Sequence, residues 1–197
     1  MADRRLDVTI MGERLTLVTR PGLFSPEHVD RGTLAMLSVA GFAPGLQVMD
    51  LGCGYGVVGI LAAKKCGAEN VVMSDIDPEA VDTARANAAA NGVDGVMIAV
   101  SDGFAQLDEA GFDLILSNPP YQTDFSVAKA FIEKGFNRLK IGGRMLMVTK
   151  RRDWYRNKLR AIFGGVRVHE IDGYYVFEAQ KRQPSYANAA RRRRGSA

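Results

Sequence analysis

The tetrapeptide Asn118-Pro119-Pro120-Tyr121 has the residue types needed to bind a planar amino group. An amine conjugated with a ring or a carbonyl has a delocalised lone pair, and two acceptors on its N–H groups can free that pair toward an electrophile. The Asn118 side-chain oxygen and the Pro119 carbonyl would be those acceptors, with the prolines stiffening the loop and Tyr121 stacking on the substrate. The alternative is a strand that simply ends in an Asn-Pro turn.

A glycine-rich stretch, MDLGCGYGVVG, precedes this tetrapeptide by about 60 residues. Gly52, Gly54 and Gly56 leave room for the backbone to turn and for a ligand to lie against it. A loop between a first strand and a first helix is where open parallel sheets bind nucleotides. Gly54, Gly56 and Gly59 also satisfy G-x-G-x-x-G, with Asp75 about 20 residues further on, so a dinucleotide is an alternative ligand.

Three acids, Asp50, Asp75 and Asp102, are expected at the ends of successive strands. The carboxyl ends of parallel strands meet at one edge of a sheet, and a carboxylate after the second strand suits the ribose hydroxyls of a nucleotide. Each acid alone could be a loop or cap residue, and Asp77 before Pro78 is assigned to helix capping. Together, the three acids favour a ligand site.

Short apolar strands alternate with helices, which predicts a parallel sheet with helices on both faces. The segments VRVHEI and YYVFEAQ flank Asp172-Gly173, a dipeptide that predicts a closing antiparallel hairpin. The expected strands are 47–51, 70–74, 96–100, 112–117 and 144–149, and the expected helices are 57–65, 78–91, 127–139 and about 154–163.

The N-terminal segment has a different pattern. Apolar and polar residues alternate on both sides of Gly12, which predicts a β-hairpin over residues 6–19. After the loop RPGLF, Ser25 is expected to be the N-cap of a helix with Pro26 at its first position, running to about Val39.

The composition is that of one globular domain, with 47% hydrophobic and 24% charged residues. No apolar run approaches the ~20 residues of a membrane span, and the N-terminus lacks the apolar core of a signal peptide. We therefore expect a cytoplasmic protein that does not contact a membrane. Two cysteines, Cys53 and Cys66, match no zinc spacing, and His28 and His169 have no nearby Cys or His, so reduced thiols and no metal are expected.

Positive charge is concentrated in two segments. Residues 181–197 carry six positive charges and no acid, and we expect 183–197 to be a disordered tail that is either a solvated end or an electrostatic arm for nucleic acid. The segment KRRDWYRNKLR interleaves cations with aromatic residues, as RNA-binding surfaces do, and Lys150, Arg151, Arg152 and Trp154 are its candidate RNA contacts. The alternative is a solvated amphipathic helix with Trp154 in the core.

An acid followed by Gly-x-Gly-x-Gly resembles the first motif of the class I S-adenosylmethionine-dependent methyltransferases. The resemblance implies that Asp50 and the loop residues lie beside the methionine part of S-adenosyl-L-methionine. It also implies that Asp75 binds the ribose and that Ile76 packs on the adenine. The implied cofactor-binding residues are Asp50, Gly52, Cys53, Gly54, Gly56, Asp75, Ile76, Asp102, Gly103 and Asn118.

A narrower resemblance rests on the stretches RPGLFSPEHVDRGT, DLGCGYGVVGI, the NPP turn and DGYYVFEA. They are similar to the small-subunit ribosomal RNA guanine-N2 methyltransferases, the RsmC-like or "methyltransferase small domain" family, over roughly residues 6–182. The resemblance implies an α/β, Rossmann-like fold with a seven-stranded, mostly parallel sheet. Numbered along the chain, its strands would lie in the order 3-2-1-4-5-7-6, with the last antiparallel. The expected organisation is an N-terminal β-hairpin and cap loop (1–25), a methyltransferase domain (26–182) and the tail (183–197).

The same resemblance implies that Phe24 and Ser25 lie over the pocket, with Asp30 near it. Two departures bear on the substrate. The better-known ribosomal enzymes of the family carry a second, degenerate methyltransferase domain ahead of the catalytic one, which is not expected here. Their turn commonly continues with Phe and His, whereas Gln122 follows Tyr121 in this sequence. Gln122 is therefore a candidate substrate contact.

The expected function is methyl transfer to an exocyclic amine, guanine N2 of ribosomal RNA, by a monomer or homodimer whose partner is ribosomal RNA or the small ribosomal subunit. Four alternatives stay open. They are a protein glutamine-amide methyltransferase, an adenine-N6 enzyme acting on tRNA or DNA, a non-catalytic cofactor-binding module and an NAD-dependent oxidoreductase.

Overall fold

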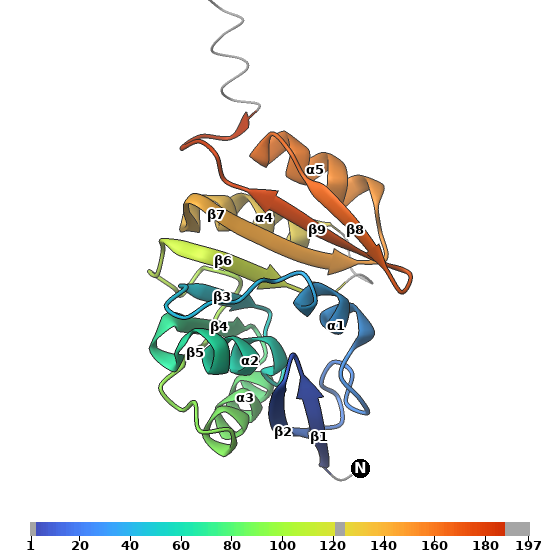
Figure 1. The fold of residues 1–197 in the computed structure, drawn as a ribbon, viewed down its shortest axis with the longest axis vertical. Coiled ribbons are helices and arrows are strands. Elements are labelled where there is room, and N and C mark those ends of the chain that lie inside the picture. The colour runs from blue at the N-terminus through green and yellow to red at the C-terminus, as the bar shows by residue number, and fades with distance from the viewer. Residues whose placement is uncertain (1–2, 121–124, 188–197) are drawn as a thin grey trace, which may run out of the picture.

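The computed structural model describes residues 3–120 and 125–187 of the 197-residue chain. Seven strands form one sheet in the order β5-β4-β3-β6-β7-β9-β8, which confirms the expected order (Figure 1). Strands β3 to β7 are parallel, and β9 runs antiparallel between β7 and β8. The strands are β3 Val48–Leu51, β4 Val71–Asp75, β5 Met97–Val100, β6 Phe112–Ser117, β7 Leu139–Thr149, β8 Arg167–Ile171 and β9 Tyr174–Gln180.

Helices cover both faces of the sheet because successive strand residues point to opposite faces. Val48 belongs to the core cluster that includes residues of α1, α2 and α3, whereas Met49 belongs to the cluster that includes residues of α4 and α5. Because apolar residues are fully buried on both faces of the sheet, the sequences of the central strands are continuous hydrophobic runs. The helices are α1 Arg31–Leu37, α2 Val57–Cys66, α3 Pro78–Ala90, α4 Ser126–Arg138 and α5 Asp153–Phe163, with a 3₁₀ turn at Ala68–Asn70.

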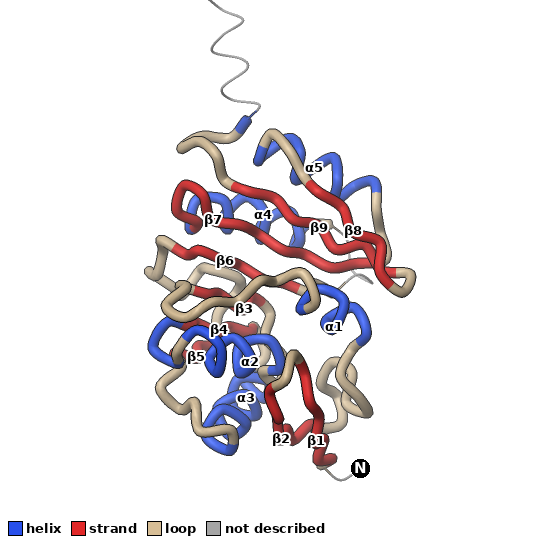
Figure 2. The backbone as a smooth tube through the Cα atoms, viewed as in Figure 1, coloured by secondary structure: helices blue, strands red, loops and turns tan. Residues whose placement is uncertain are grey.

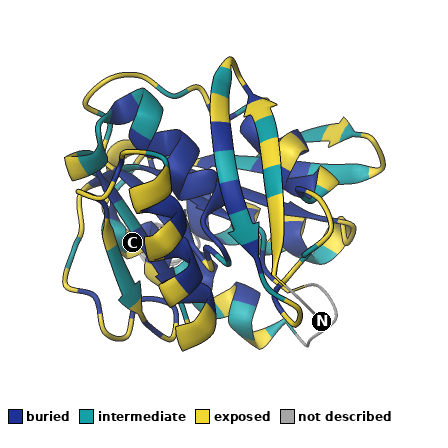
Figure 3. Ribbon diagram, turned by 90° about the horizontal axis from the view of Figure 1, so that it is seen from below, coloured by how far each residue is buried: buried dark blue, intermediate teal, exposed yellow. Residues whose placement is uncertain are grey.

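The N-terminal hairpin, β1 Arg4–Ile10 and β2 Glu13–Thr19, forms as predicted and lies at the opposite end of the molecule from β8 and β9 (Figure 2). From Leu15 to Thr19, buried residues alternate with partly buried ones along β2 (Figure 3). The side chains of Asn87 in α3 and of Asn91, its C-cap, each accept from and donate to the β2 backbone, at Val18 and Thr16 respectively. These side chains satisfy the edge of β2 that a further strand would otherwise pair with.

The first helix begins later than predicted. Ser25 is not an N-cap: its φ is 50° and its hydroxyl donates to the His28 carbonyl at 2.7 Å. The Pro26 carbonyl accepts from the Thr19 hydroxyl at 2.6 Å, which ties this loop to the hairpin. Asp30 caps α1 instead, with Thr33 N–H donating to its carboxylate at 2.8 Å. The expectation at Asp77 is confirmed, since its side chain accepts from Glu79 N–H and caps α3.

Two further boundaries differ from the prediction. Strand β7 begins at Leu139 rather than residue 144, because the backbone of Gly142 and Gly143 pairs with Lys181 instead of turning. At the C-terminus, Tyr186 packs edge-on against Phe136 and its hydroxyl donates to the Glu133 carbonyl at 3.0 Å. Contact with the body thus continues past the expected boundary at residue 182, and residues 188–197 of the predicted tail lie outside the described residues.

Within the described part of the chain, no helix is long and apolar enough to cross a membrane. Over the same residues, no cluster of three His, Cys, Asp or Glu side chains could hold a metal ion.

Candidate functional site

A cavity of about 310 Å³ lies at the carboxyl ends of β3, β4 and β6, where the sequence places its motifs. It brings together most of the predicted site residues: Phe24, Asp30, Asp50, Gly52, Cys53, Gly54, Asp75, Ile76, Asp102, Gly103, Asn118, Pro119 and Pro120. The topology explains this, because strand order reverses beside β3 and leaves a crevice there. Tyr121 and Gln122 lie outside the described residues.

The glycine loop forms the floor of the cavity. The N–H groups of Gly52 and Cys53 both donate to the Ser74 carbonyl at 2.9 Å, which fixes the loop across the end of β4. Gly56 is not a lining residue; it is the N-cap of α2 with φ 99°, and a Cβ there would lie 3.0 Å from Met73 Cε. Gly56 therefore serves the packing of α2 on the sheet, while Gly52 and Gly54 face the cavity.

Asp75, at the end of β4, is held on both carboxylate oxygens. One accepts from Gly54 N–H at 2.8 Å, and the other from Asp77 N–H at 3.0 Å. Next to it, the Ile76 side chain is 67% exposed although it is apolar, and it lines the cavity. A fixed carboxylate beside an exposed apolar side chain suits a ligand with hydroxyl groups and a flat ring.

Asp50 is only 3% exposed and accepts from Gly59 N–H at 2.8 Å, so it anchors the first turn of α2. Burial raises the pKa of Asp50 to about 7; the Gly59 N–H opposes this shift and the Asp75 charge adds to it. Burial likewise raises the pKa of the neighbouring Cys53 thiol well above its usual value, so this cysteine lines the cavity as a protonated thiol.

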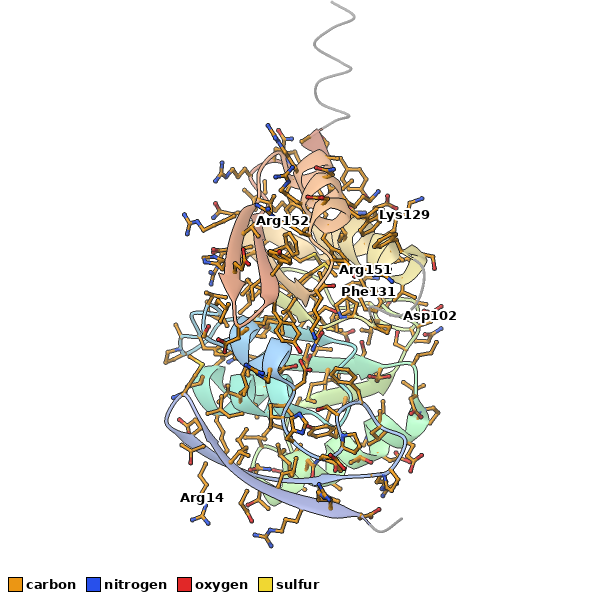
Figure 4. All side chains as sticks on the ribbon, turned by 90° about the vertical axis from the view of Figure 1, so that its right-hand side faces the viewer. Arg14, Asp102, Lys129, Phe131, Arg151 and Arg152 are labelled. Carbon is orange, nitrogen blue, oxygen red and sulfur yellow. The ribbon has the colours of Figure 1, made fainter. Side chains whose placement is uncertain are left out.

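The loop after β5 closes the cavity on another side. Asp102 is exposed there, and its N–H donates to Gln106 Oε1 at 2.8 Å. A Cβ on Gly103 would lie 3.1 Å from the Phe131 ring, which reaches in from α4. Asp102 and Phe131 lie on the same side of the molecule as Arg151 (Figure 4).

Asn118 follows β6 and faces α1 across the cavity. Its side-chain amide nitrogen donates to Asp30 Oδ2 at 2.9 Å and to Thr33 Oγ1 at 3.0 Å. Pro119 is buried and Pro120 is exposed, and both line the cavity. Asn118, Pro119 and Pro120 therefore border the same space as the glycine loop, which a simple strand-ending turn would not require.

The structure adds eight lining residues that sequence reasoning missed: Thr33, Tyr55, Val57, Val58, Ser74, Ser101, Val127 and Phe131. Tyr55 stands inside the GCGYG stretch, so that motif could have indicated it. Burial raises the pKa of Tyr55 to about 12, with a smaller contribution from the Asp30 charge. Val127 and Phe131 belong to the apolar face of a helix, and the sequence does not distinguish residues facing the cavity from residues facing the sheet.

Phe24 lines the cavity with 49% of its surface exposed, as expected of a residue over the pocket. Ser25 does not line it; its carbonyl lies 3.5 Å from the Tyr55 hydroxyl.

The basic segment lies beside the cavity rather than inside it. Lys150, Arg151 and Arg152 are exposed, and each cation lies over an aromatic ring: Tyr174 at 5.0 Å, Phe125 at 5.1 Å and Tyr175 at 5.7 Å respectively. We call these three cations and their rings the basic rim. Trp154 is different: it is half-buried and stacks on Phe125 at 4.2 Å between ring centroids. One face of the Trp154 ring is thus covered, and this residue supports the basic rim by packing.

Comparison with known proteins points to one family. The sequence profile of the methyltransferase small domain family matches residues 14–178. The ribosomal RNA small subunit methyltransferase C of Pseudomonas putida is 32% identical over 184 residues, which cover 90% of this chain and 54% of that protein. The protein of the same name from Cronobacter sakazakii is 34% identical over 161 residues, or 80% and 46% of the two chains.

Solved structures agree. The T. thermophilus 16S rRNA N2 G1207 methyltransferase (RsmC), determined in complex with AdoMet and guanosine, superposes with a TM-score of 0.82 at 30% identity. The superposition covers 91% of this chain and 51% of that one. A ribosomal protein L11 methylase from Lactobacillus delbrueckii subsp. bulgaricus, at 19% identity and a TM-score of 0.63, shares the fold alone. This chain spans about half the length of the curated relatives it matches.

Proposed function

Because the chain belongs to the methyltransferase small domain family, we propose that it transfers a methyl group from S-adenosylmethionine to the exocyclic N2 amine of a guanine in ribosomal RNA. The observation that carries the proposal is the position of Asn118, whose amide borders the same cavity as the glycine loop and Asp75. A hydrogen-bonding amide beside a nucleotide-type pocket is what methylation of a planar amine requires.

The residues of the cavity fit this cofactor better than a dinucleotide. Four acids line it, Asp30, Asp50, Asp75 and Asp102, and the described lining residues include no Lys, Arg or His. Asp50 is partly protonated because its pKa is raised to about 7, but the other three carboxylates favour a sulfonium cation and would repel the two phosphates of NAD. Asp75 would hold the ribose hydroxyls, Ile76 would pack on the adenine and Asp102 would accept from its amino group, while Gly52, Cys53 and Gly54 would lie beside the methionine part.

When bound, the sulfonium supplies an already activated methyl group, so no strong general base is needed. The protein's own contribution is to position the acceptor. The Asn118 oxygen and the Pro119 carbonyl would accept the two N–H groups of the amine and turn its lone pair toward the cavity. The rigid prolines reduce the ordering that binding costs.

The basic rim supports an RNA substrate. Exposed cations lie over rings beside the mouth of the cavity and offer charge to a phosphate backbone. The relatives named for ribosomal RNA methylation support this choice of substrate, which also implies a cytoplasmic enzyme.

The test is methyl transfer from tritiated S-adenosylmethionine to small-subunit ribosomal RNA taken from cells that lack the gene. The expected product is labelled N2-methylguanosine. Asn118→Ala should slow transfer about 100-fold while S-adenosylhomocysteine affinity stays within about 2-fold. Asn137→Ala, on the outer surface of α4, is the matched control and should leave the rate unchanged.

Other outcomes identify the alternatives. Label in N6-methyladenosine or in a protein glutamine would overturn the assignment to guanine. Tight S-adenosylhomocysteine binding without transfer to any substrate would indicate a non-catalytic binding module, and calorimetric heat with NAD but not with S-adenosylhomocysteine would indicate an oxidoreductase.

A further inference from the structure

The groups around Asn118 decide the orientation of its side-chain amide. An asparagine amide has an oxygen that accepts and a nitrogen that donates two N–H groups, and the two ends are nearly the same size. Asn118 Nδ2 lies 2.9 Å from Asp30 Oδ2 and 3.0 Å from Thr33 Oγ1. An ionised carboxylate only accepts, so a flipped amide would set two oxygens against each other.

We propose that Asp30 and Thr33 are positioning residues that hold the amide nitrogen of Asn118, so that its oxygen faces the amine of the substrate. This inference rests on the proposed function. Both N–H groups of the amide are engaged by α1, and the carbonyl oxygen therefore lies on the side of the amide away from Asp30. The site then presents an acceptor and selects a donor such as an exocyclic amine. The reverse orientation would present N–H groups and favour a ring nitrogen or a carbonyl.

The beginning of α1 is built around this contact. Asp30 Oδ2 accepts twice, from Thr33 N–H at 2.8 Å and from Asn118, so the bond that caps the helix also fixes the carboxylate. Thr33 is buried, which shields its bond to Asn118 from water. These contacts turn the short stretch Asp30-Arg31-Gly32-Thr33 into a rigid support for the amide.

Gly32 gives independent evidence for the same arrangement. A Cβ at this position would lie 2.9 Å from Asp30 Oδ2 and 2.8 Å from the Tyr174 ring of β9. Any larger residue would displace either the carboxylate or the ring. The missing side chain thus leaves the space in which Asp30 can reach Asn118.

The direct test separates capping from positioning. Asp30→Ser keeps a side chain that can cap α1 but is too short to reach Asn118. We expect its single-turnover methyl-transfer rate to fall about 10-fold, with S-adenosylhomocysteine affinity within about 2-fold of the parent. Asp82→Ser makes the same exchange at an exposed acid of α3 that does not line the cavity and should leave the transfer rate unchanged.

A double-mutant cycle shows whether Asp30 acts through Asn118. In the Asn118→Ala background, Asp30→Ser should change the rate by less than about 2-fold, because the amide it positions is gone. A further 10-fold loss in that background, or no loss from Asp30→Ser alone, would overturn the positioning role. If Asn118→Ala itself retains full transfer, it is the proposed function of Asn118 that fails.

Asp30→Asn distinguishes positioning from a role for the charge. An asparagine oxygen can still accept from both Thr33 N–H and Asn118, so transfer should stay within about 3-fold of the parent. A loss as large as that of Asp30→Ser would assign Asp30 to proton or charge chemistry and contradict the inference.

Discussion

Two walls of the cavity are held in place in different ways. The acid wall consists of Asp50, Asp75 and Asp102 at the ends of β3, β4 and β5, and the amide wall consists of Asp30, Thr33 and Asn118. Asp50 is bonded to a backbone N–H 9 residues away and Asp75 to one 21 residues away. The amide wall depends on hydrogen bonds between side chains that lie far apart in the sequence, with separations of 85 positions for Thr33–Asn118 and 88 positions for Asp30–Asn118. The acid wall therefore belongs to the strand–loop–helix units, whereas the amide wall forms only when α1 docks beside β6.

The largest expected effect is on the acid wall. Asp75→Ala removes the proposed ribose contacts and also releases Gly54 N–H, so S-adenosylhomocysteine affinity should fall about 30- to 100-fold by calorimetry. At saturating cofactor, the transfer rate should fall far less than in Asn118→Ala. Asp82→Ala, an exposed acid on α3, is the control. If Asp75→Ala leaves S-adenosylhomocysteine affinity unchanged, Asp75 does not contribute to cofactor binding.

The same contrast explains what the sequence could predict. Asp75 and Asp102 were predictable because parallel strands end at one edge, so an acid after each strand must reach a common place. The hydrogen bond from Asn118 to Thr33 was not predictable, because no residue near position 118 in the sequence specifies which helix will lie against Asn118. Ser25 was mistaken for a helix cap because the local Ser-Pro pattern does not show that Thr19 binds the Pro26 carbonyl and keeps the loop open. Trp154 was ambiguous because its partner, Phe125, lies on another helix boundary.

The next largest effect is expected at Asp50, whose pKa of about 7 in the folded protein lies above the ordinary aspartate value of 3.8. A raised acid pKa means that the folded protein keeps a proton which the unfolded chain has lost. The stability contributed by that proton is full below about pH 4 and is lost as the pH rises to about 7, by roughly 1.4 kcal/mol for each unit of pKa difference.

Asp50→Asn removes this titration while keeping an oxygen for Gly59 N–H. The free energy of unfolding of the variant, relative to the parent, should therefore rise between pH 4 and 7 in urea titrations and then level off. The exposed exchange Asp82→Asn should show no such rise. Parallel curves for parent and Asp50→Asn would mean that Asp50 has the same pKa in the folded and the unfolded chain, and would contradict the raised pKa.

A smaller effect is expected when the amide wall is disturbed without removing any of its polar groups. Gly32→Ala would ordinarily stabilise a helix by about 1 kcal/mol. Here its Cβ would meet Asp30 and Tyr174, so we expect about a 10-fold lower transfer rate and S-adenosylhomocysteine affinity within about 2-fold. Gly95→Ala, whose Cβ would lie 3.5 Å from Ala68, is the matched control. If Gly32→Ala lowers S-adenosylhomocysteine affinity as much as it lowers the transfer rate, then disturbing the amide wall also disturbs cofactor binding, and the two walls are not independent.

The smallest effect is expected at the basic rim, which lies outside both walls. Replacing Arg151 and Arg152 by alanine should weaken binding of small-subunit ribosomal RNA about 3- to 10-fold at low salt and reduce the salt slope by about 2, since each cation that contacts a phosphate contributes about 1. Methyl transfer at saturating RNA should change little, because neither arginine lines the cavity. The control replaces Arg4 and Arg14 of the hairpin, with Arg14 at the opposite end of the molecule (Figure 4). An equal loss of RNA affinity in the control pair would show that binding depends only on the total charge of the protein. A loss of affinity confined to Arg151 and Arg152 would place the RNA backbone beside the amide wall, where the proposed acceptor amine must enter.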